Sequence, residues 1–111
     1  MKSISRELMG ASAIPIILSV LRNADSYGYE IVQRVKELTN DGITWKEASI
    51  YPVLKKLENA GMIKSYWKVQ AGQRPRRYYT LLVDGEKQLE QNMQEWELIQ
   101  TVFATLLKPA T

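Results

Sequence analysis

The residues in this sequence with the clearest chemical role are basic, and they are concentrated in one stretch. Residues 46–77 contain eight Lys or Arg and two Glu, a balance of +6, whereas the rest of the chain has a balance of −3. The overall net charge of +3 therefore hides a strongly positive segment. Clustered cations neutralise nucleic-acid phosphates and attract anionic partners. The charge pattern predicts a surface that binds a polyanion.

The composition excludes several classes of catalytic and metal site. The chain has no Cys and no His, which removes disulfides, thiolate zinc sites and every catalytic arrangement that depends on those side chains. The remaining carboxylates and lysines show no spacing that suggests a paired acid and base. We therefore expect no catalytic residues, no metal site and no cofactor.

A helix is predicted to carry part of the basic stretch. Thr44 and Glu47 fit a capping box, which starts the helix near Trp45 or Lys46, and Gly61 ends it. At 100° per residue, one face collects the apolar residues Ile50, Val53, Leu54 and Leu57. The opposite face and its edges carry small, polar and cationic residues: Ala48, Ser49, Tyr51, Pro52, Lys55, Lys56 and Asn59.

The exposed face of this helix admits two interpretations. A solvated face with two lysines is the ordinary one for an amphipathic helix. Pro52 favours a functional surface instead, because a proline on a solvent face lowers helix stability and gains no packing.

Two strands are predicted after this helix. Residues 63–69 alternate apolar with polar side chains, which is typical of a half-buried strand, and a second strand returns from Arg76 to Leu82. Arg74, Arg76 and Arg77 lie at or beside the turn of this hairpin. Such charges also serve to block pairing at a sheet edge. Three arginines within four positions, next to a lysine-bearing helix, favour a polyanion.

The first helix is predicted over residues 6–23 from the helical spacing of its apolar residues. Pro15 removes one of its backbone hydrogen bonds and predicts a kink or a new start near Ser12. Its apolar run is much shorter than the roughly 20 residues that span a bilayer. Glu7 precedes that run and no small-residue cleavage site follows it, unlike a signal peptide. We expect a soluble, cytoplasmic protein without a membrane partner.

A second helix is predicted from Tyr27, with Asp25 and Ser26 as candidate N-caps. Its apolar stripe consists of Tyr27, Ile31, Val35 and Leu38. Residues 39–42, Thr-Asn-Asp-Gly, then form a dense turn signal. This turn is long for a minimal helix-turn-helix and ordinary for a winged one.

A long last helix is predicted over residues 84–107. Its apolar residues recur at spacings of 4, 3, 3, 4 and 3 and form one stripe: Leu89, Met93, Trp96, Ile99, Phe103 and Leu106. A helix of about 24 residues is about 36 Å long, which exceeds what a small three-helix body covers. We expect the outer half of the stripe to pack on a second subunit and form a homodimer.

The order of these elements is that of a winged helix-turn-helix. Three segments resemble the PadR family of bacterial transcriptional regulators: YGYEI at 27–31, SIYPVLKKLENAGMI at 49–63 and RRYYTL at 76–81. The match extends across nearly the whole chain. It implies a mainly α fold with a small β-hairpin in one domain. Residues 1–82 form the DNA-binding part, and residues 83–111 form a C-terminal dimerisation helix.

The sequence departs from this family at two places. Members commonly have a threonine that caps the last helix where this chain has Leu82, so Asp84 is expected to cap it instead. Pro15 lies in a helix that remains uninterrupted in the compact subfamily, whose members have a single C-terminal helix. This chain resembles that subfamily through Trp96.

The resemblance implies a repressor that binds an inverted repeat of double-stranded DNA as a homodimer. The helix after residue 46 is expected in the major groove, and the hairpin on the backbone or minor groove nearby. Phosphate contacts are assigned to Lys46, Lys55, Lys56, Arg74, Arg76 and Arg77, and groove contacts to Ser49, Tyr51 and Pro52. The alternative is a winged helix that docks another protein without binding specific DNA, and such binding survives added salt.

Trp96 admits two interpretations, and both stay open. A tryptophan on a long apolar stripe most often forms interface core. In multidrug-responsive members of the compact subfamily, the two tryptophans of a dimer hold a flat, apolar effector between them. On that interpretation Leu8, Pro15 and Met93 form additional walls of the ligand site.

Overall fold

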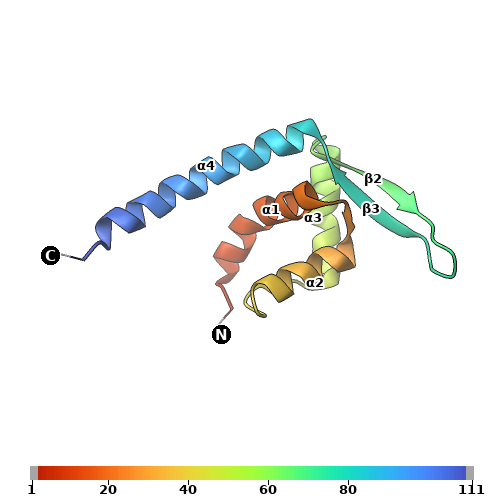
Figure 1. Ribbon diagram of the computed structural model, residues 1–111, viewed down its shortest axis with the longest axis horizontal. Helices are drawn as coiled ribbons and strands as arrows, with labels where there is room; N and C mark the ends of the chain where they lie inside the picture. Colours follow the sequence, from red (N-terminus) through yellow and green to blue (C-terminus); the bar gives the residue numbers. More distant parts are fainter. Residues whose placement is uncertain (1–2, 110–111) are drawn as a thin grey trace.

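The computed structural model describes residues 3–109, which form four helices and one three-stranded antiparallel sheet. In chain order the elements are α1 (Arg6–Asn23), β1 (Ser26–Tyr27), α2 (Gly28–Leu38), α3 (Glu47–Asn59), β2 (Ile63–Lys68), β3 (Arg76–Leu81) and α4 (Val83–Leu106). Helices α1 to α3 form a compact body, from which the β2–β3 hairpin projects on one side and α4 on the other (Figure 1). The fold is the predicted winged helix-turn-helix with a long C-terminal helix.

The core lies between the three helices of the body and the inner face of the sheet. Helix α3 contributes Ile50, Leu54 and Leu57, as the helical wheel predicts. The other buried apolar residues are Ile17, Leu18, Val20, Leu21, Ile31, Val32, Val35, Ile63, Tyr79 and Leu89. Full burial of one such side chain contributes about 1.5–3 kcal/mol. This core fixes the exposed face of α3 relative to the hairpin.

The first turn of α4 is anchored to the body. A Cβ atom on Gly85 would lie 2.2 Å from the carbonyl oxygen of Met62, so only a glycine allows this close approach. The backbone N–H of Leu82 donates to the same carbonyl oxygen at 3.0 Å. The predicted boundary between residues 1–82 and residues 83–111 falls at this junction. Residues 1–2 and 110–111 lie outside the described part of the chain. Helix α4 therefore leaves the body from a fixed origin.

Helix α1 contains Pro15 and runs without a break over its full length. It changes direction along its course (Figure 1), as expected where a proline removes a backbone hydrogen bond. The hydroxyls of Ser12 and Ser19 donate to the carbonyl oxygens of Leu8 and Pro15, at 2.6 and 2.7 Å. The helix thus bends, and the alternative of a new start near Ser12 is wrong.

The short strand β1 corrects the predicted start of the second helix. Its two residues pair with Tyr79 and Tyr78 of β3, in the sheet order β1-β3-β2. The Ser26 hydroxyl donates to a Glu30 carboxylate oxygen at 2.6 Å, and α2 has no side-chain cap. The prediction that Asp25 or Ser26 caps α2 is therefore wrong. A two-residue strand has no alternation that a sequence pattern could reveal.

Two further predicted caps are also wrong. The Thr44 hydroxyl donates to the carbonyl oxygen of Asp41 at 3.2 Å, and α3 begins at Glu47 without a side-chain cap. Helix α4 begins at Val83, so Asp84 lies inside its first turn. A negative charge there suits the positive end of the helix dipole and stabilises the helix without capping it.

Two turns agree with the sequence. Asn40 and Asp41 have φ angles of 50° and 67°, in the left-handed region that Asn and Asp tolerate best among residues with a Cβ. Gly61 follows α3 with a φ of 75°. The N–H of Met62 then donates to the Leu57 carbonyl oxygen at 3.0 Å, which closes the helix in a Schellman arrangement.

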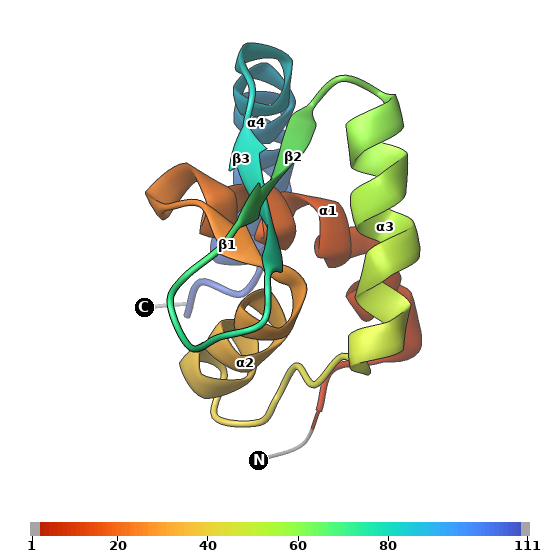
Figure 2. The same cartoon turned by 90° about the vertical axis from the view of Figure 1, so that its right-hand side faces the viewer.

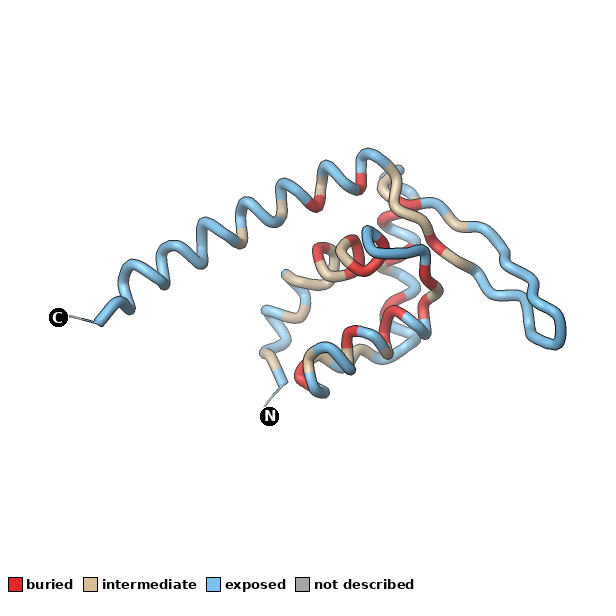
Figure 3. The backbone as a smooth tube through the Cα atoms, viewed as in Figure 1, coloured by how far each residue is buried: buried red, intermediate tan, exposed pale blue. Residues whose placement is uncertain are grey.

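Burial along the hairpin differs from the prediction of a half-buried strand. Beyond Ser65 the side chains of this segment are exposed, 64% for Trp67 and 73% for Val69. The hairpin projects past the body, so the core ends before the strands do (Figure 3). Leu38, the last residue of the predicted apolar stripe of α2, is likewise exposed.

Candidate nucleic-acid interface

Helix α3 and the β2–β3 hairpin border a hollow of about 920 Å³, called here the α3–hairpin hollow. Figure 2 looks toward the hairpin and shows α3 beside the sheet. Five of the nine residues predicted to contact DNA line this hollow: Tyr51, Lys55, Arg74, Arg76 and Arg77. Folding thus brings the basic side chain of α3 close to the arginines of residues 74–77, although β2 lies between these two segments in the sequence.

The other four predicted contacts lie on α3 or at its start, outside the hollow. Lys46, Ser49 and Pro52 are exposed. Lys56 borders a separate pocket that α3 forms with α1 and α4, which places it away from the hairpin. Within residues 3–109, none of the lysines at positions 46, 55 and 56 forms an ion pair. Their charges are available to an external anion.

Tyr51 is held in place by the body although 45% of it is exposed. Its ring lies on Gly28 at the start of α2, where a Cβ atom would come within 2.9 Å of the ring. Its hydroxyl donates to a Glu47 carboxylate oxygen at 3.3 Å. Burial and, next, the nearby Glu47 charge raise the pKa of Tyr51. The ring therefore presents a neutral, fixed edge to the hollow.

Arg77 has partners inside the protein. Its guanidinium Nη2 lies 3.4 Å from Glu58 Oε1 of α3 and donates to the Ser65 hydroxyl of β2 at 2.8 Å. The Ser65 hydroxyl donates in turn to Glu58 Oε2 at 2.5 Å. These three residues, called here the Glu58 triad, join the helix to both strands. The charge of Arg77 is partly compensated, unlike that of Arg74, which forms no ion pair in the described chain.

The face of the sheet turned away from Ser65 carries a cluster of three tyrosines, in which Tyr66 stacks on Tyr78 and Tyr27 is tilted against it. The rings of Tyr27 and Tyr66 flank that of Tyr78, with centroids 5.2 and 5.9 Å from it. The Arg76 guanidinium lies 4.6 Å from the centroid of Tyr27. The Tyr66 hydroxyl donates to the Asp25 carboxylate at 2.6 Å, and this hydrogen bond raises the pKa of Tyr66 to about 12. This tyrosine cluster, which the sequence analysis missed, depends on a strand register that spacing alone does not reveal.

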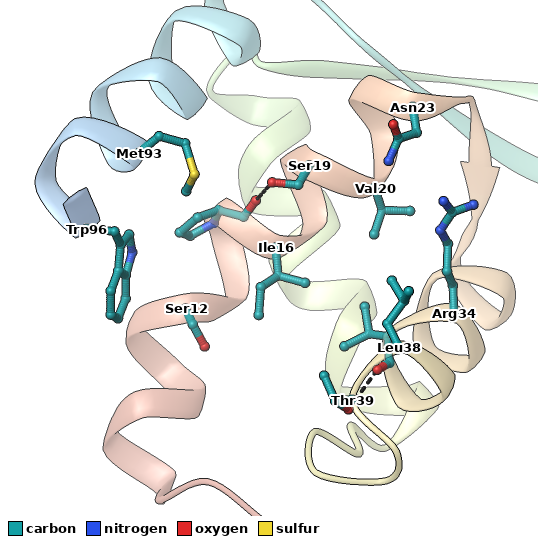
Figure 4. Close-up of a pocket in the computed structure, with 12 residues that line it drawn as sticks. Ser12, Ile16, Ser19, Val20, Asn23, Arg34, Leu38, Thr39, Met93 and Trp96 are labelled. Atoms are coloured by element: carbon teal, nitrogen blue, oxygen red, sulfur yellow. Dashed lines mark hydrogen bonds between the residues drawn. The ribbon is translucent and has the colours of Figure 1, made fainter. Parts of the chain in front are cut away.

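A second cavity, of about 410 Å³ and mostly apolar, lies between α1, α2 and α4. Three of the four residues predicted to bind an effector line it: Pro15, Met93 and Trp96. Leu8 does not line it. Figure 4 shows Met93 and Trp96 on one side and a group from α2 on the other, namely Arg34, Leu38 and Thr39. Sequence analysis missed the α2 side, because no pattern links those positions to α4.

The outer part of α4 carries an uncovered apolar surface. Ile99, Phe103 and Leu106 of the predicted interface are exposed, by 47%, 56% and 75%. Leu89, also predicted at the interface, is buried in the core of the protomer instead. Large apolar side chains that continue along one helix mark a surface that packs against something else.

No helix within residues 3–109 is long and apolar enough to cross a membrane. No cluster of three or more Asp or Glu side chains in the same range could hold a metal ion.

Comparisons with known proteins relate this arrangement to transcriptional regulators. The model of the "Transcriptional regulator PadR-like family" matches residues 17–91. The structure of a transcriptional regulator from Clostridium thermocellum is 35% identical, with a TM-score of 0.83, over 95% of this chain and 99% of that one. The structure of Bacillus subtilis PadR in complex with operator DNA is 32% identical, with a TM-score of 0.65, over 71% of this chain and 45% of that one.

In sequence, the "Negative transcriptional regulator PadR" of Bacillus subtilis (strain 168) is 34% identical over 73 residues. These residues cover 66% of this chain and 40% of that protein. The chain thus matches less than half the length of Bacillus subtilis PadR, and nearly all of the Clostridium thermocellum regulator.

Proposed function

The chain belongs to the PadR-like family of transcriptional regulators, and we propose that it is a repressor that binds an inverted repeat in operator DNA as a homodimer. Members of this family regulate transcription and are not enzymes. The observation that carries the proposal is the α3–hairpin hollow, where exposed cations of two segments face one space beside a half-exposed tyrosine. We propose that it acts in the cytoplasm.

In the proposed complex α3 enters the major groove. Its exposed side combines small residues, which allow close approach, with Ser49 and Tyr51 toward the base edges. Lys55 and Arg74, from the two sides of the hollow, reach phosphates and fix the orientation of the protein on the duplex. The hairpin contacts the backbone or the minor groove nearby. Cations that lack partners in the described chain support these assignments.

The homodimer is supported by the uncovered apolar stripe on α4. A two-fold dimer presents two copies of α3 in opposite orientations, so its DNA site must repeat as an inverted sequence. In helix-turn-helix dimers the half-sites lie about 34–36 Å apart, one turn of the duplex. We propose that the outer halves of α4 and the N-terminal helices of the two subunits form this contact.

We further propose that a flat, apolar effector releases the repressor by binding beside Trp96. A cavity of about 410 Å³ that contains Trp96, Met93 and Pro15 supports such a site, since small-molecule pockets commonly have volumes of about 300–1,000 Å³. Leu8 belongs to the predicted site and not to this cavity, so it would contribute only where two subunits meet. Packing of Trp96 in the dimer interface is the competing role.

The experiment that tests the DNA-binding proposal is selection of genomic fragments by the purified protein, followed by sequencing. The expected result is a shared inverted repeat with half-sites about one duplex turn apart. Fragments without a common sequence would contradict operator recognition. A protein partner whose binding survives added salt would then favour a protein-docking role.

Titration with a planar dye tests the effector proposal. Ligand stacking should quench tryptophan fluorescence and weaken operator binding, because an effector must bind the two states of the protein unequally. Trp45 and Trp67 also emit, so the change must diminish sharply in Trp96→Ala. If Trp96 is interface core, Trp96→Ala lowers the free energy of unfolding by about 3–5 kcal/mol and no dye saturates either protein. Equal dye binding by both proteins would rule out the effector role of Trp96.

A further inference from the structure

Trp67 is an exposed aromatic residue inside a basic surface. It lines the α3–hairpin hollow together with Tyr51, Lys55 and Arg74. Its side chain is 64% exposed, although indole is among the largest apolar groups in proteins. The sequence pattern predicts it on the buried face of a strand and gives it no function. The fold does not cover it, so packing in the described chain does not explain it.

The strand register explains where the indole points. Trp67 pairs with Arg77, and Ser65 pairs with Tyr79, so all four lie on one face of the hairpin. That face is turned toward α3, because Ser65 bonds to Glu58 and Tyr79 is buried. Trp67 lies on the part of the hairpin that projects past the body. Its side chain therefore lines the hollow and is not covered by the core. Tyr66 and Tyr78 occupy the opposite face of the hairpin.

We propose that Trp67 is a DNA contact whose indole packs on deoxyribose at the edge of the groove beside the hairpin. Proteins that bind the minor groove often place large apolar side chains against the DNA beside cationic ones. Arg74, which lines the hollow and forms no ion pair in the described chain, supplies such a cation here. The inference rests on the proposed function, and it adds an apolar contact to a surface otherwise described by charge and hydrogen bonds.

This contact has a signature that separates it from the cationic ones. An indole that is buried on sugar releases no condensed counterions, whereas each lysine that leaves a phosphate flattens the plot of log K against log salt by about 0.9 units. Trp67→Ala should therefore weaken binding about tenfold or more while leaving the salt slope unchanged. Lys55→Ala should weaken binding and flatten the slope.

The experiment measures fluorescence anisotropy of a labelled duplex that carries the selected operator, over a series of salt concentrations. The variants are Trp67→Ala, Trp67→Phe and the control Val69→Ala. Val69 lies near Trp67, is 73% exposed and is not part of the hollow. Trp67→Phe should retain part of the affinity and Val69→Ala all of it. Equal affinities of Trp67→Ala, Val69→Ala and the parent would overturn the inference.

A spectroscopic measurement is independent of any loss of affinity. In a Trp45→Phe/Trp96→Phe background, Trp67 is the sole tryptophan, and operator binding should shield its fluorescence from quenching by acrylamide. Unchanged quenching by acrylamide in the saturated complex would also overturn the inference. Should the parent bind no duplex at any salt concentration, the proposed function fails and this inference fails with it. If the parent binds DNA with a steep salt slope and Trp67→Ala binds with the same affinity, the inference about Trp67 is wrong and the proposed function stands.

Discussion

The side chains around the α3–hairpin hollow differ in how firmly the protein holds them. Tyr51 lies on Gly28 and bonds to Glu47, so its ring has a fixed position. Lys55 and Arg74 have no ion-pair partner in the described chain and can adapt to the duplex. A fixed group suits discrimination between bases, whereas a mobile cation suits phosphate contact. Specificity is therefore expected from Tyr51 more than from its basic neighbours.

Tyr51→Ala should lower operator affinity about tenfold and lower affinity for a random duplex about threefold or less. The reason is that a groove contact is lost while the phosphate contacts remain. Competition binding with the two duplexes measures both affinities. Tyr51→Phe is the matched variant, because it keeps the ring on Gly28 and loses the bond to Glu47. Equal losses on both duplexes in Tyr51→Ala would remove Tyr51 from the recognition surface.

The sequence predicted which residues of the hollow are exposed, but not which of them contact one another. The charge pattern and the helical wheel predicted that Lys55 and Arg74 are exposed, because surface charge and helical period are properties of neighbouring positions. The partners of Arg77 were not predictable in this way. The Glu58 triad joins α3, β2 and β3, and its geometry exists only once the strand register is set.

At the scale of elements, the Glu58 triad links α3 to both strands of the hairpin. It lies on the side of the sheet that faces α3, and its members are partly exposed. Ion pairs of this kind contribute about 0–1 kcal/mol to stability, so the triad positions the hairpin more than it holds the fold together. It also partly compensates the charge of Arg77.

Glu58→Gln should release Arg77 to bind phosphate. We expect a rise of about threefold or more in affinity for random DNA and a salt slope steeper by about one unit per protomer. The free energy of unfolding should change by less than about 1 kcal/mol. Anisotropy and urea denaturation measure the two effects. Glu86→Gln is the control, because it breaks the exposed Arg22–Glu86 pair elsewhere on the protein. Identical slopes for both variants would show that Arg77 stays sequestered.

The elements themselves were largely predictable, and their ends were not. Helical periodicity predicted α1 over residues 6–23 and α4 within one residue at each end. The predicted N-caps at Ser26, Thr44 and Asp84 were wrong. A side chain caps a helix only where the fold leaves a backbone N–H group free to bond to it. Strand β1 was missed for the same reason, since its only partner is β3. Trp67 was predicted as buried because alternation does not reveal where a core ends.

At the scale of the whole molecule, the chain is 62 Å long and 21 Å across its thinnest dimension. The outer part of α4 extends beyond the body at one end of this length (Figure 3). It carries the exposed side chains of Phe103 and Leu106. A helix that projects alone with an apolar face is stabilised when that face is covered. The proposed dimer covers it with a second copy and places two α3 helices on one duplex.

Phe103→Glu combined with Leu106→Glu should convert the dimer to monomers. Each charge enters an apolar seam without a partner and costs several kcal/mol. Analytical ultracentrifugation measures the association state, and circular dichroism checks that the body stays folded. The control is Gln94→Glu with Thr101→Glu, which adds the same two charges on the other side of α4. A well-folded dimer at low concentration in the first variant would show that the interface lies elsewhere.

The proposed dimer binds operator DNA through α3 and the hairpin, with cations of both elements on phosphates. The most direct test is the salt dependence of operator affinity for the parent and for Lys55→Ala/Arg74→Ala. If the dimer neutralises about eight phosphates, log K should fall with log salt at a slope near −7. The double variant removes two contacts from each subunit, so its slope should be flatter by about 3 to 4 units. A slope near zero for the parent, or the same steep slope for both proteins, would contradict the account.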